Sequence, residues 1–251
     1  MKVCIVGVGY VGLVTGICLA EIGHDVICVD NVKEKIEKLK NSKSPIYEPG
    51  LEAFIESNLK KNKIQFTTDL KEGVENSEII FISVGTPSLP NGQADLSYVE
   101  AVATDIGRYI NNEKIIVNKS TVPIGSGDWV SMIVSESIVK NNPNKNINFN
   151  VVSNPEFLRE GCAIGDTFFP DRIVIGSSSE TAINKMLELY KPLIEQSFDW
   201  NGDFERLLPK GQKVPIVTTD LTSAEMIKYA ANSLLATKIS FINKIANICE
   251  K

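Results

Sequence analysis

The chain has 251 residues, of which 43% are hydrophobic and 23% are charged, and its formal net charge is −5. These values are ordinary for a soluble globular protein, and the length suits one large or two modest domains. The negative charge gives no reason to expect a nucleic-acid partner. No apolar run approaches the ~20 residues that cross a bilayer. Five cysteines in no metal-like spacing favour a reduced, cytoplasmic location and no metal site.

Short β-branched runs alternate with longer amphipathic stretches along the chain. Strands are expected at residues 2–8, 25–30, 78–84, 114–118, 150–153 and 172–175. Helices are expected at residues 11–22, 33–40, 51–61, 98–109, 127–139 and 179–194. Strands that alternate with helices predict an α/β fold, here a Rossmann-type, doubly wound, mainly parallel sheet.

Two polar stretches, at residues 141–146 and 199–214, are expected to be loops, and the second closes a first domain of residues 1–215. Residues 216–251 then form a long helix. Thr222 and Glu225 match the capping-box spacing that starts a helix. Apolar residues continue on more than one face as far as Cys249, so a further domain or a partner subunit must cover them. We expect a homodimer through the helix of residues 222–249.

A dinucleotide fingerprint lies at the N-terminus. Gly7, Gly9 and Gly12 follow a strand pattern and open a helix pattern, and Asp30 ends the second strand. Gly7 permits the tight turn, Gly9 lets the backbone approach a pyrophosphate, and Gly12 lets helix and strand pack closely. Asp30 would accept from ribose hydroxyls and repel a 2′-phosphate, which favours NAD over NADP. Lys35 could reach the cofactor or could be a solvated surface lysine.

Two threonines follow predicted strands directly. Thr86 and Thr121 lie in loops at the carboxyl ends of strands, where a doubly wound sheet binds its ligands. They are therefore candidates to contact cofactor or substrate. The alternative is that each hydroxyl only bonds its own loop backbone.

Two pairs of polar residues recur at four-residue spacing. If the segment after residue 153 is helical, Glu156 and Glu160 share one face, where paired acids suit proton transfer or the holding of a water. Alternatively they are solvated acids that flank Arg159. Lys228 and Asn232 lie one helical turn apart, and Lys228 could donate to a developing oxyanion. The alternative for Lys228 is a surface ion pair with Glu225.

The segments 154–161 (Asn-Pro-Glu-Phe-Leu-Arg-Glu-Gly) and 225–232 (Glu-Met-Ile-Lys-Tyr-Ala-Ala-Asn), together with the fingerprint, resemble the UDP-glucose dehydrogenase family. Enzymes of this family oxidise the C6 alcohol of UDP-glucose twice, with two NAD+, to UDP-glucuronate. Further stretches that match the family are residues 45–51, 94–99, 119–123, 170–172 and 238–243.

The resemblance implies roles for individual residues. The expected catalytic residues are Thr121, Glu156, Glu160, Lys228 and Asn232. The expected NAD contacts are Gly7, Gly9, Tyr10, Val11, Gly12, Asp30, Lys35, Thr86, Thr121 and Glu160. The expected contacts with UDP-glucose are Glu156, Phe157, Leu158, Arg159, Glu160, Lys228 and Asn232.

One feature of the family is absent from these 251 residues. Its nucleophile is a cysteine in a Gly-x-Cys-x-x-Lys-Asp motif, which captures the aldehyde as a thiohemiacetal, and no such motif occurs here. Cys249 lies in an apolar helix pattern, and nothing beside Cys162 suggests an activated thiolate. We therefore expect the chain to bind NAD without completing the oxidation alone. Two alternatives are a hydroxyacid dehydrogenase of the 6-phosphogluconate type, which needs no cysteine, and a non-catalytic NAD-binding or dimerisation module.

Overall fold

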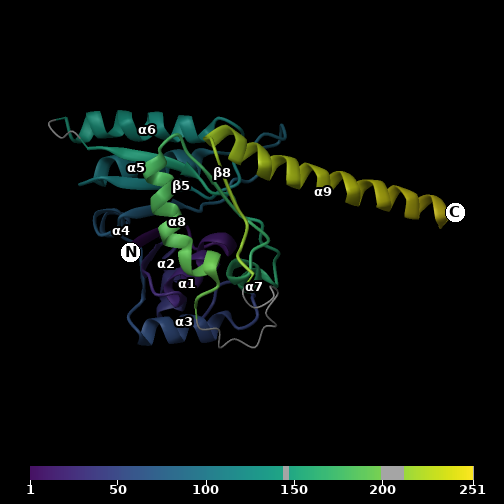
Figure 1. Cartoon of the computed structure of the whole chain (residues 1–251), viewed down its shortest axis with the longest axis horizontal. Coiled ribbons are helices and arrows are strands. Elements are labelled where there is room, and N and C mark those ends of the chain that lie inside the picture. Colours follow the sequence, from purple (N-terminus) through teal and green to yellow (C-terminus); the bar gives the residue numbers. More distant parts are fainter. Residues whose placement is uncertain (144–146, 199–211, 251) are drawn as a thin grey trace.

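The computed structural model describes residues 1–143, 147–198 and 212–250. Within these ranges the chain forms one sheet with helices on both faces, followed by a long helix that extends away from the rest (Figure 1). The polar segment predicted at residues 199–214 falls mostly outside the described residues. The predicted α/β fold with a long C-terminal helix is confirmed.

In the described chain the sheet has eight strands in the order β3-β2-β1-β4-β5-β6-β7-β8. The strands are β1 (Lys2–Val6), β2 (Asp25–Val29), β3 (Ile64–Thr67), β4 (Ile79–Ile82), β5 (Lys114–Asn118), β6 (Phe149–Ser153), β7 (Ile173–Gly176) and β8 (Ile216–Thr219). Neighbouring strands are parallel except for β6 and β7, which are antiparallel. Sequence patterns missed β3 and β8, because each has only four residues and carries polar side chains.

The helices are α1 (Tyr10–Glu21), α2 (Lys33–Lys40), α3 (Leu51–Lys60), α4 (Leu70–Glu75), α5 (Ser97–Tyr109), α6 (Ser126–Asn141), α7 (Ala163–Phe168), α8 (Glu180–Glu195) and α9 (Leu221–Cys249). Asn141, which was expected in a loop, is the last residue of α6. The six-residue helices α4 and α7 were not predicted, because so short a segment does not display a helical period.

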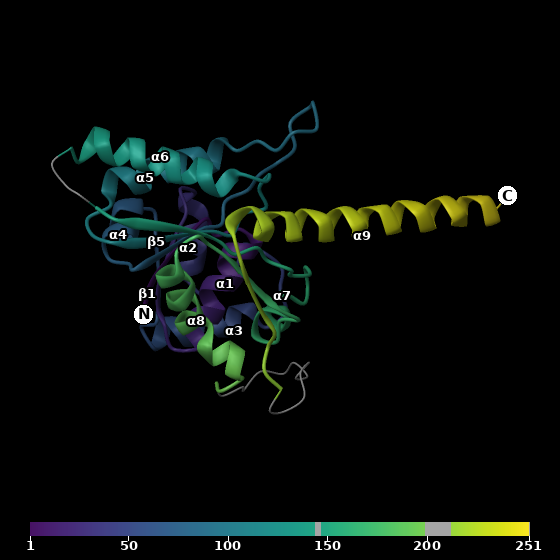
Figure 2. The same cartoon turned by 45° about the horizontal axis from the view of Figure 1, so that its top comes forward.

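Two hydrophobic layers cover the two faces of the sheet. Alternate residues of β1 point to opposite faces, so that Val3 and Ile5 belong to one layer and Cys4 and Val6 to the other. Helices α1, α2, α3, α7 and α8 contribute to the first layer, and α4, α5 and α6 to the second. Figure 2 shows α5 and α6 on the opposite side of the sheet from α1, α3 and α8.

The strand order reverses at β1. The chain moves from β1 outward through β2 to β3, and then returns to the other side of β1 as β4. A doubly wound sheet binds its ligand at such a switch point, outside the carboxyl ends of the strands. The loops after β1, β4, β5 and β6 therefore meet at one edge of the molecule.

Helix α9 has 29 residues and leaves the domain after its first turns (Figures 1 and 2). Its remaining length exposes large apolar side chains to solvent, among them Leu234, Leu235, Ile239, Phe241, Ile242 and Ile248. In the part of the chain that the structure describes, no helix is long and apolar enough to cross a membrane.

Candidate active site

The glycine turn after β1 has the geometry that its sequence predicted. Gly7 has a φ of +99°, a left-handed conformation that favours glycine. A Cβ added at Gly12 would lie 1.9 Å from the carbonyl oxygen of Gly7, whereas one added at Gly9 would meet nothing within 4 Å. Gly9 is the N-cap of α1 and caps it with no side chain, so the first N–H groups of the helix stay available to an anion. The turn therefore fits a dinucleotide pyrophosphate.

Asp30 closes this turn from the end of β2. Its carboxylate accepts from the backbone N–H groups of Val8 (2.9 Å) and Val32 (3.0 Å), and Lys35 Nζ lies 3.6 Å from it. These contacts hold the acid beside the turn, where it can accept from ribose hydroxyls. Lys35 is half-buried and lies against Asp30.

The loops after β4 and β5 are joined at the same edge. The Thr86 hydroxyl donates to the carbonyl oxygen of Thr121 (2.8 Å). Ser120 donates back to Val84 (2.8 Å), which ties the two loops from the other side. The Thr86 hydroxyl thus bonds a neighbouring loop rather than its own loop backbone, and Thr86 and Thr121 lie next to each other.

The segment after β6 is not helical. Residues 154–159 form an irregular loop, so the expectation that Glu156 and Glu160 share a helix face is wrong. Glu156 turns back to accept from the Leu158 N–H (2.8 Å), which bends the chain. Arg159 pairs with Asp166 of α7 through its backbone N–H and both ends of its guanidinium. That ion pair raises the pKa of Arg159.

Lys228 meets Glu156 across the site. The Lys228 Nζ lies 2.8 Å from Glu156 Oε1, and the two side chains are only 9% and 12% exposed. The Phe157 ring lies beside this pair, with its centroid 5.3 Å from the Lys228 ammonium. The Arg172 guanidinium lies over the same ring, 4.1 Å from the centroid. The alternative surface pair of Lys228 with Glu225 is therefore wrong: Lys228 points into the site.

Glu225 has a different partner. Its carboxylate accepts from the backbone N–H groups of Gly125 (2.6 Å) and Gly127 (2.7 Å) at the start of α6. Burial raises the pKa of Glu225, and the two N–H donors oppose that rise. The expected capping box at Thr222 is wrong, because Asp220 caps α9 by accepting from Ser223 N–H (2.8 Å).

A buried polar network, which sequence patterns missed, lies behind the ion pair. Lys119 donates to Asn154 Oδ1 (3.1 Å), which also accepts from the Tyr190 hydroxyl (2.6 Å). Asn154 in turn donates to the carbonyl oxygen of Val174 (2.7 Å). Burial lowers the pKa of Lys119 to about 8, and the nearby negative charge of Glu156 opposes this shift.

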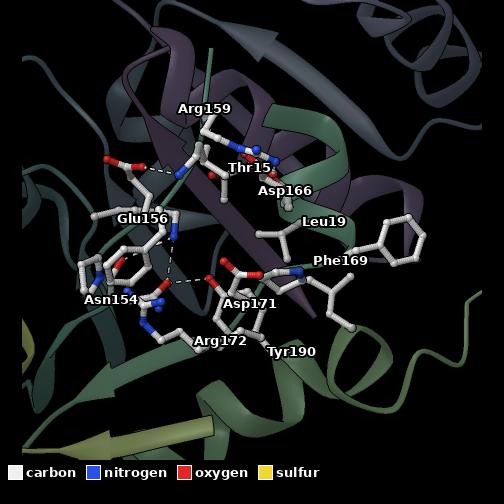
Figure 3. Close-up of a pocket in the computed structure, with 18 residues that line it drawn as sticks. Thr15, Leu19, Asn154, Glu156, Arg159, Asp166, Phe169, Asp171, Arg172 and Tyr190 are labelled. Atoms are coloured by element: carbon white, nitrogen blue, oxygen red, sulfur yellow. Dashed lines mark hydrogen bonds and ion pairs between the residues drawn. The ribbon is translucent and has the colours of Figure 1, made fainter. Parts of the chain in front are cut away.

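Glu156, Lys119, Asn154 and Tyr190 line one cavity of about 470 Å³, whereas Lys228 lies outside its lining. In Figure 3 Glu156 and Arg159 lie on one side of the view, and Asn154 lies on the other with Tyr190, to which it is bonded, and Arg172. Phe157 and Leu158, both predicted substrate contacts, also line it. The cavity mixes apolar walls with charged groups, as expected of a site for a polar small molecule.

Other residues that the sequence singled out lie outside the lining of this cavity. Glu160 is exposed and close enough to the Tyr10 phenol for its charge to contribute to the raised pKa of Tyr10, for which burial is the main cause. Asn232 is exposed one helical turn beyond Lys228 on α9. Cys162 and Cys249 are exposed free thiols. Among the described residues no group of acids, histidines and cysteines could hold a metal ion.

Comparisons with known proteins agree with this geometry. Residues 1–194 match the NAD binding domain of the UDP-glucose/GDP-mannose dehydrogenase family, and residues 222–251 match its central domain. The chain belongs to this family. It therefore carries the NAD-binding domain of a group of oxidoreductases.

Curated relatives align with this chain over its whole length. It is 49% identical over 250 residues to UDP-glucose 6-dehydrogenase TuaD of Bacillus subtilis, covering 100% of the chain and 49% of that relative. It is 47% identical over 255 residues to a UDP-glucose 6-dehydrogenase of Rhizobium meliloti, covering 100% of the chain and 53% of that relative. The chain thus spans about half the length of the curated relatives it matches.

Solved structures of the family also match nearly all of this chain and about half of their own length. A UDP-glucose dehydrogenase from Pyrobaculum islandicum superposes with a TM-score of 0.84 at 36% identity, over 97% of this chain and 52% of that one. A GDP-mannose dehydrogenase from Pseudomonas aeruginosa superposes with a TM-score of 0.83 at 37% identity, again over 97% and 52%. Both relatives act on nucleotide sugars by name, although on different ones.

Proposed function

We propose that this chain is the cofactor-binding part of an enzyme that oxidises UDP-glucose at C6 to UDP-glucuronate with two NAD+. The observation that carries the proposal is the Lys228–Glu156 pair, 2.8 Å apart, in which Glu156 lines the cavity of the site. The pair places a cation and a carboxylate where an alcohol could lie next to a nicotinamide. The names of the curated relatives support the choice of sugar nucleotide.

In this proposal NAD+ binds on the turn formed by Gly7, Gly9 and Gly12, with Tyr10 and Val11 supplying N–H groups to its phosphates. Asp30 accepts from the adenosine ribose and disfavours NADP+. NAD+ supplies the hydride acceptor of each oxidation. The exposed edge at Gly9 supports this assignment, since a backbone can approach a phosphate closely there.

The remaining residues act on the substrate in the same proposal. Lys228 stabilises negative charge on the C6 oxygen, and Asn232 holds the reacting group. Glu156 holds the Lys228 ammonium in place. Thr121 and Glu160 position the water that the second oxidation consumes, because oxidising an alcohol to a carboxylate adds one oxygen atom.

The backbone and side chains of residues 156–160 would contact the sugar. Support comes from the cavity, to which Glu156, Phe157, Leu158 and Arg159 all contribute.

We further propose that residues 1–215 form the NAD-binding unit and residues 216–251 the start of a central, dimer-forming helix. The five cysteines are all unpaired, which supports a reducing cytoplasmic location. The Gly-x-Cys-x-x-Lys-Asp motif is absent from these 251 residues. The chain by itself should therefore bind NAD+ without completing the four-electron oxidation.

The test is calorimetric titration of this chain with NAD+, NADP+ and UDP-glucose, together with a spectrophotometric assay for NADH. We expect NAD+ to bind, NADP+ to bind more weakly, and no sustained NADH formation. Lys228→Met should weaken any binding of UDP-glucose and leave NAD+ binding unchanged. Sustained turnover would refute the claim that this chain cannot complete the oxidation by itself. NAD+ binding with no response to UDP-glucose or to the substitution would favour the non-catalytic module.

A further inference from the structure

A buried carboxylate lies outside the groups assigned so far. Glu48 is only 6% exposed, in the loop that precedes α3. Among the described residues no lysine, arginine or histidine lies within ion-pair distance of it. A buried charge without a counter-ion is costly unless hydrogen bonds satisfy it. Its partners therefore indicate what the charge is for.

Two of its three partners belong to the segments assigned to cofactor and substrate, and the third lies in α7. Glu48 Oε2 accepts from the Tyr10 hydroxyl and from the backbone N–H of Gly161 (2.9 Å), and Oε1 accepts from the Ile164 N–H (3.2 Å). Tyr10 is the first residue of α1, directly after the glycine turn. Gly161 ends the loop that carries Glu160. One carboxylate thus joins the cofactor turn to the loop proposed to bind substrate.

The contact between Tyr10, Glu48 and Gly161, called here the joint, is a closed set of hydrogen bonds on a constrained backbone. Gly161 N–H also donates to the Tyr10 hydroxyl, so the phenol, the carboxylate and the amide all contact one another. Gly161 has a φ of +84°, which few other residues adopt without strain. On the other side, Leu51 N–H donates to the Glu48 backbone carbonyl (3.2 Å), which ties the backbone of Glu48 to the start of α3.

We propose that Glu48 is a positioning residue that sets the substrate loop, residues 154–161, on the cofactor turn through Tyr10 and Gly161. Binding of NAD+ at the turn then orders the loop beside it, and Glu160 is held where both ligands meet. The inference rests on the proposed function in taking residues 154–161 as the substrate loop.

Hydrogen exchange of the ligand-free chain tests the link directly. Glu48→Gln keeps the shape but offers only one acceptor oxygen to donors that now use two, so we expect exchange across residues 158–164 to accelerate about tenfold or more. Glu52→Gln is the matched control, because this exposed glutamate in the next turn bonds only Ser44 and Lys43. It should leave exchange at residues 158–164 unchanged.

A second measurement separates positioning from simple structural support. NAD+ should slow exchange at residues 158–164 in the wild-type chain, and this effect should disappear in Glu48→Gln. Tyr10→Phe removes the phenol while keeping the carboxylate, so it should also abolish the NAD+ effect. Its effect and that of Glu48→Gln should not add in the double variant, because both break one joint. Tyr10→Phe also serves if Glu48→Gln fails to fold.

The outcomes are distinguishable. Unchanged exchange in ligand-free Glu48→Gln, or an NAD+ effect that survives both substitutions, would overturn the inference and leave the proposed function standing. If the wild-type chain bound no NAD+, the proposed function would fail. The ligand-free comparison of Glu48→Gln with Glu52→Gln would then decide by itself whether Glu48 holds the loop.

Discussion

The ammonium of Lys228 lies 2.8 Å from the carboxylate of Glu156, and the contact joins the first turns of α9 to the loop after β6. Both side chains are largely buried. Glu225 seats the same helix on α6 through Gly125 and Gly127. The orientation of Lys228 therefore depends on the sheet and two helices rather than on its own sequence neighbours.

Breaking this pair should destabilise the fold. Removing one partner of a buried ion pair costs about 3–5 kcal/mol, because the other charge stays buried. Glu156→Gln should cost more than Lys228→Met, since Glu156 also favours the protonated form of nearby Lys119. Urea unfolding of both single variants and the double variant measures the coupling. Additive effects would show that the contact contributes nothing to stability.

Lys119 predicts a pH dependence of stability. Its pKa is lowered to about 8 by burial, against about 10.4 in an unfolded chain, so the folded state loses this proton first. Between these two values the unfolded state binds more protons, and the free energy of unfolding rises with pH. Over this pH range the titration of Lys119 raises the free energy of unfolding by at most about 3 kcal/mol.

The comparison is wild type against Lys119→Met, measured by urea unfolding from pH 7 to 10.5. The difference in unfolding free energy should shift in favour of wild type as the pH rises. Other groups that titrate in this range cancel in the difference. A difference that stays constant across the range would place the folded-state pKa of Lys119 at its ordinary value.

The glycine turn offers a matched pair of substitutions. Gly12→Ala would force a Cβ to within 1.9 Å of the Gly7 oxygen, so we expect loss of folding or a large drop in melting temperature. Gly9→Ala meets open space and should fold normally, yet its methyl group would occupy the path of the pyrophosphate. Its NAD+ affinity should fall about tenfold or more. Unchanged affinity by calorimetry would move the phosphates away from Gly9.

Asp30 should decide between the two nicotinamide cofactors. Asp30→Asn keeps one acceptor oxygen but removes the charge that repels a 2′-phosphate. The ratio of NADP+ to NAD+ dissociation constants should fall about tenfold or more. Asp25→Asn, at the other end of β2, removes a charge far along the same strand and is the control. An equal change in both variants would attribute the preference to net charge alone.

The exposed face of α9 should drive self-association. Ile242 is 58% exposed in the single chain, among other large apolar residues. Such a face favours burial against a second copy. Ile242→Glu should shift the chain toward monomer in analytical ultracentrifugation, whereas Lys244→Gln on the same helix should not. A monomeric wild type at high concentration would contradict the proposed dimer.

The sequence alone was sufficient for the features that depend on short contiguous segments. The glycine turn is one, because Gly7 and Gly12 act through backbone geometry over a few residues and Asp30 ends the next strand. The alternation of strands and helices is another, since burial on both faces of a parallel sheet leaves a legible apolar pattern. Short elements such as β3 and α7 were missed, because the four residues of β3 include polar side chains and the six residues of α7 make less than two helical turns.

Only the tertiary structure decided which polar groups meet. Glu156 and Glu160 would share a face only in a helical segment, but the chain there is a loop that directs Glu156 toward Lys228 and leaves Glu160 exposed. Glu225 matched a capping box and instead bonds Gly125 and Gly127.

The links of Glu48 to Gly161 and of Lys119 to Asn154 have no signal in sequence spacing. The partners lie far apart along the chain. Lys119 and Asn154 meet because the parallel strands β5 and β6 end at the same edge of the sheet, whereas Glu48 reaches Gly161 from the loop before α3. Once buried there, each charge can be satisfied only by the donors and acceptors that the neighbouring loops present.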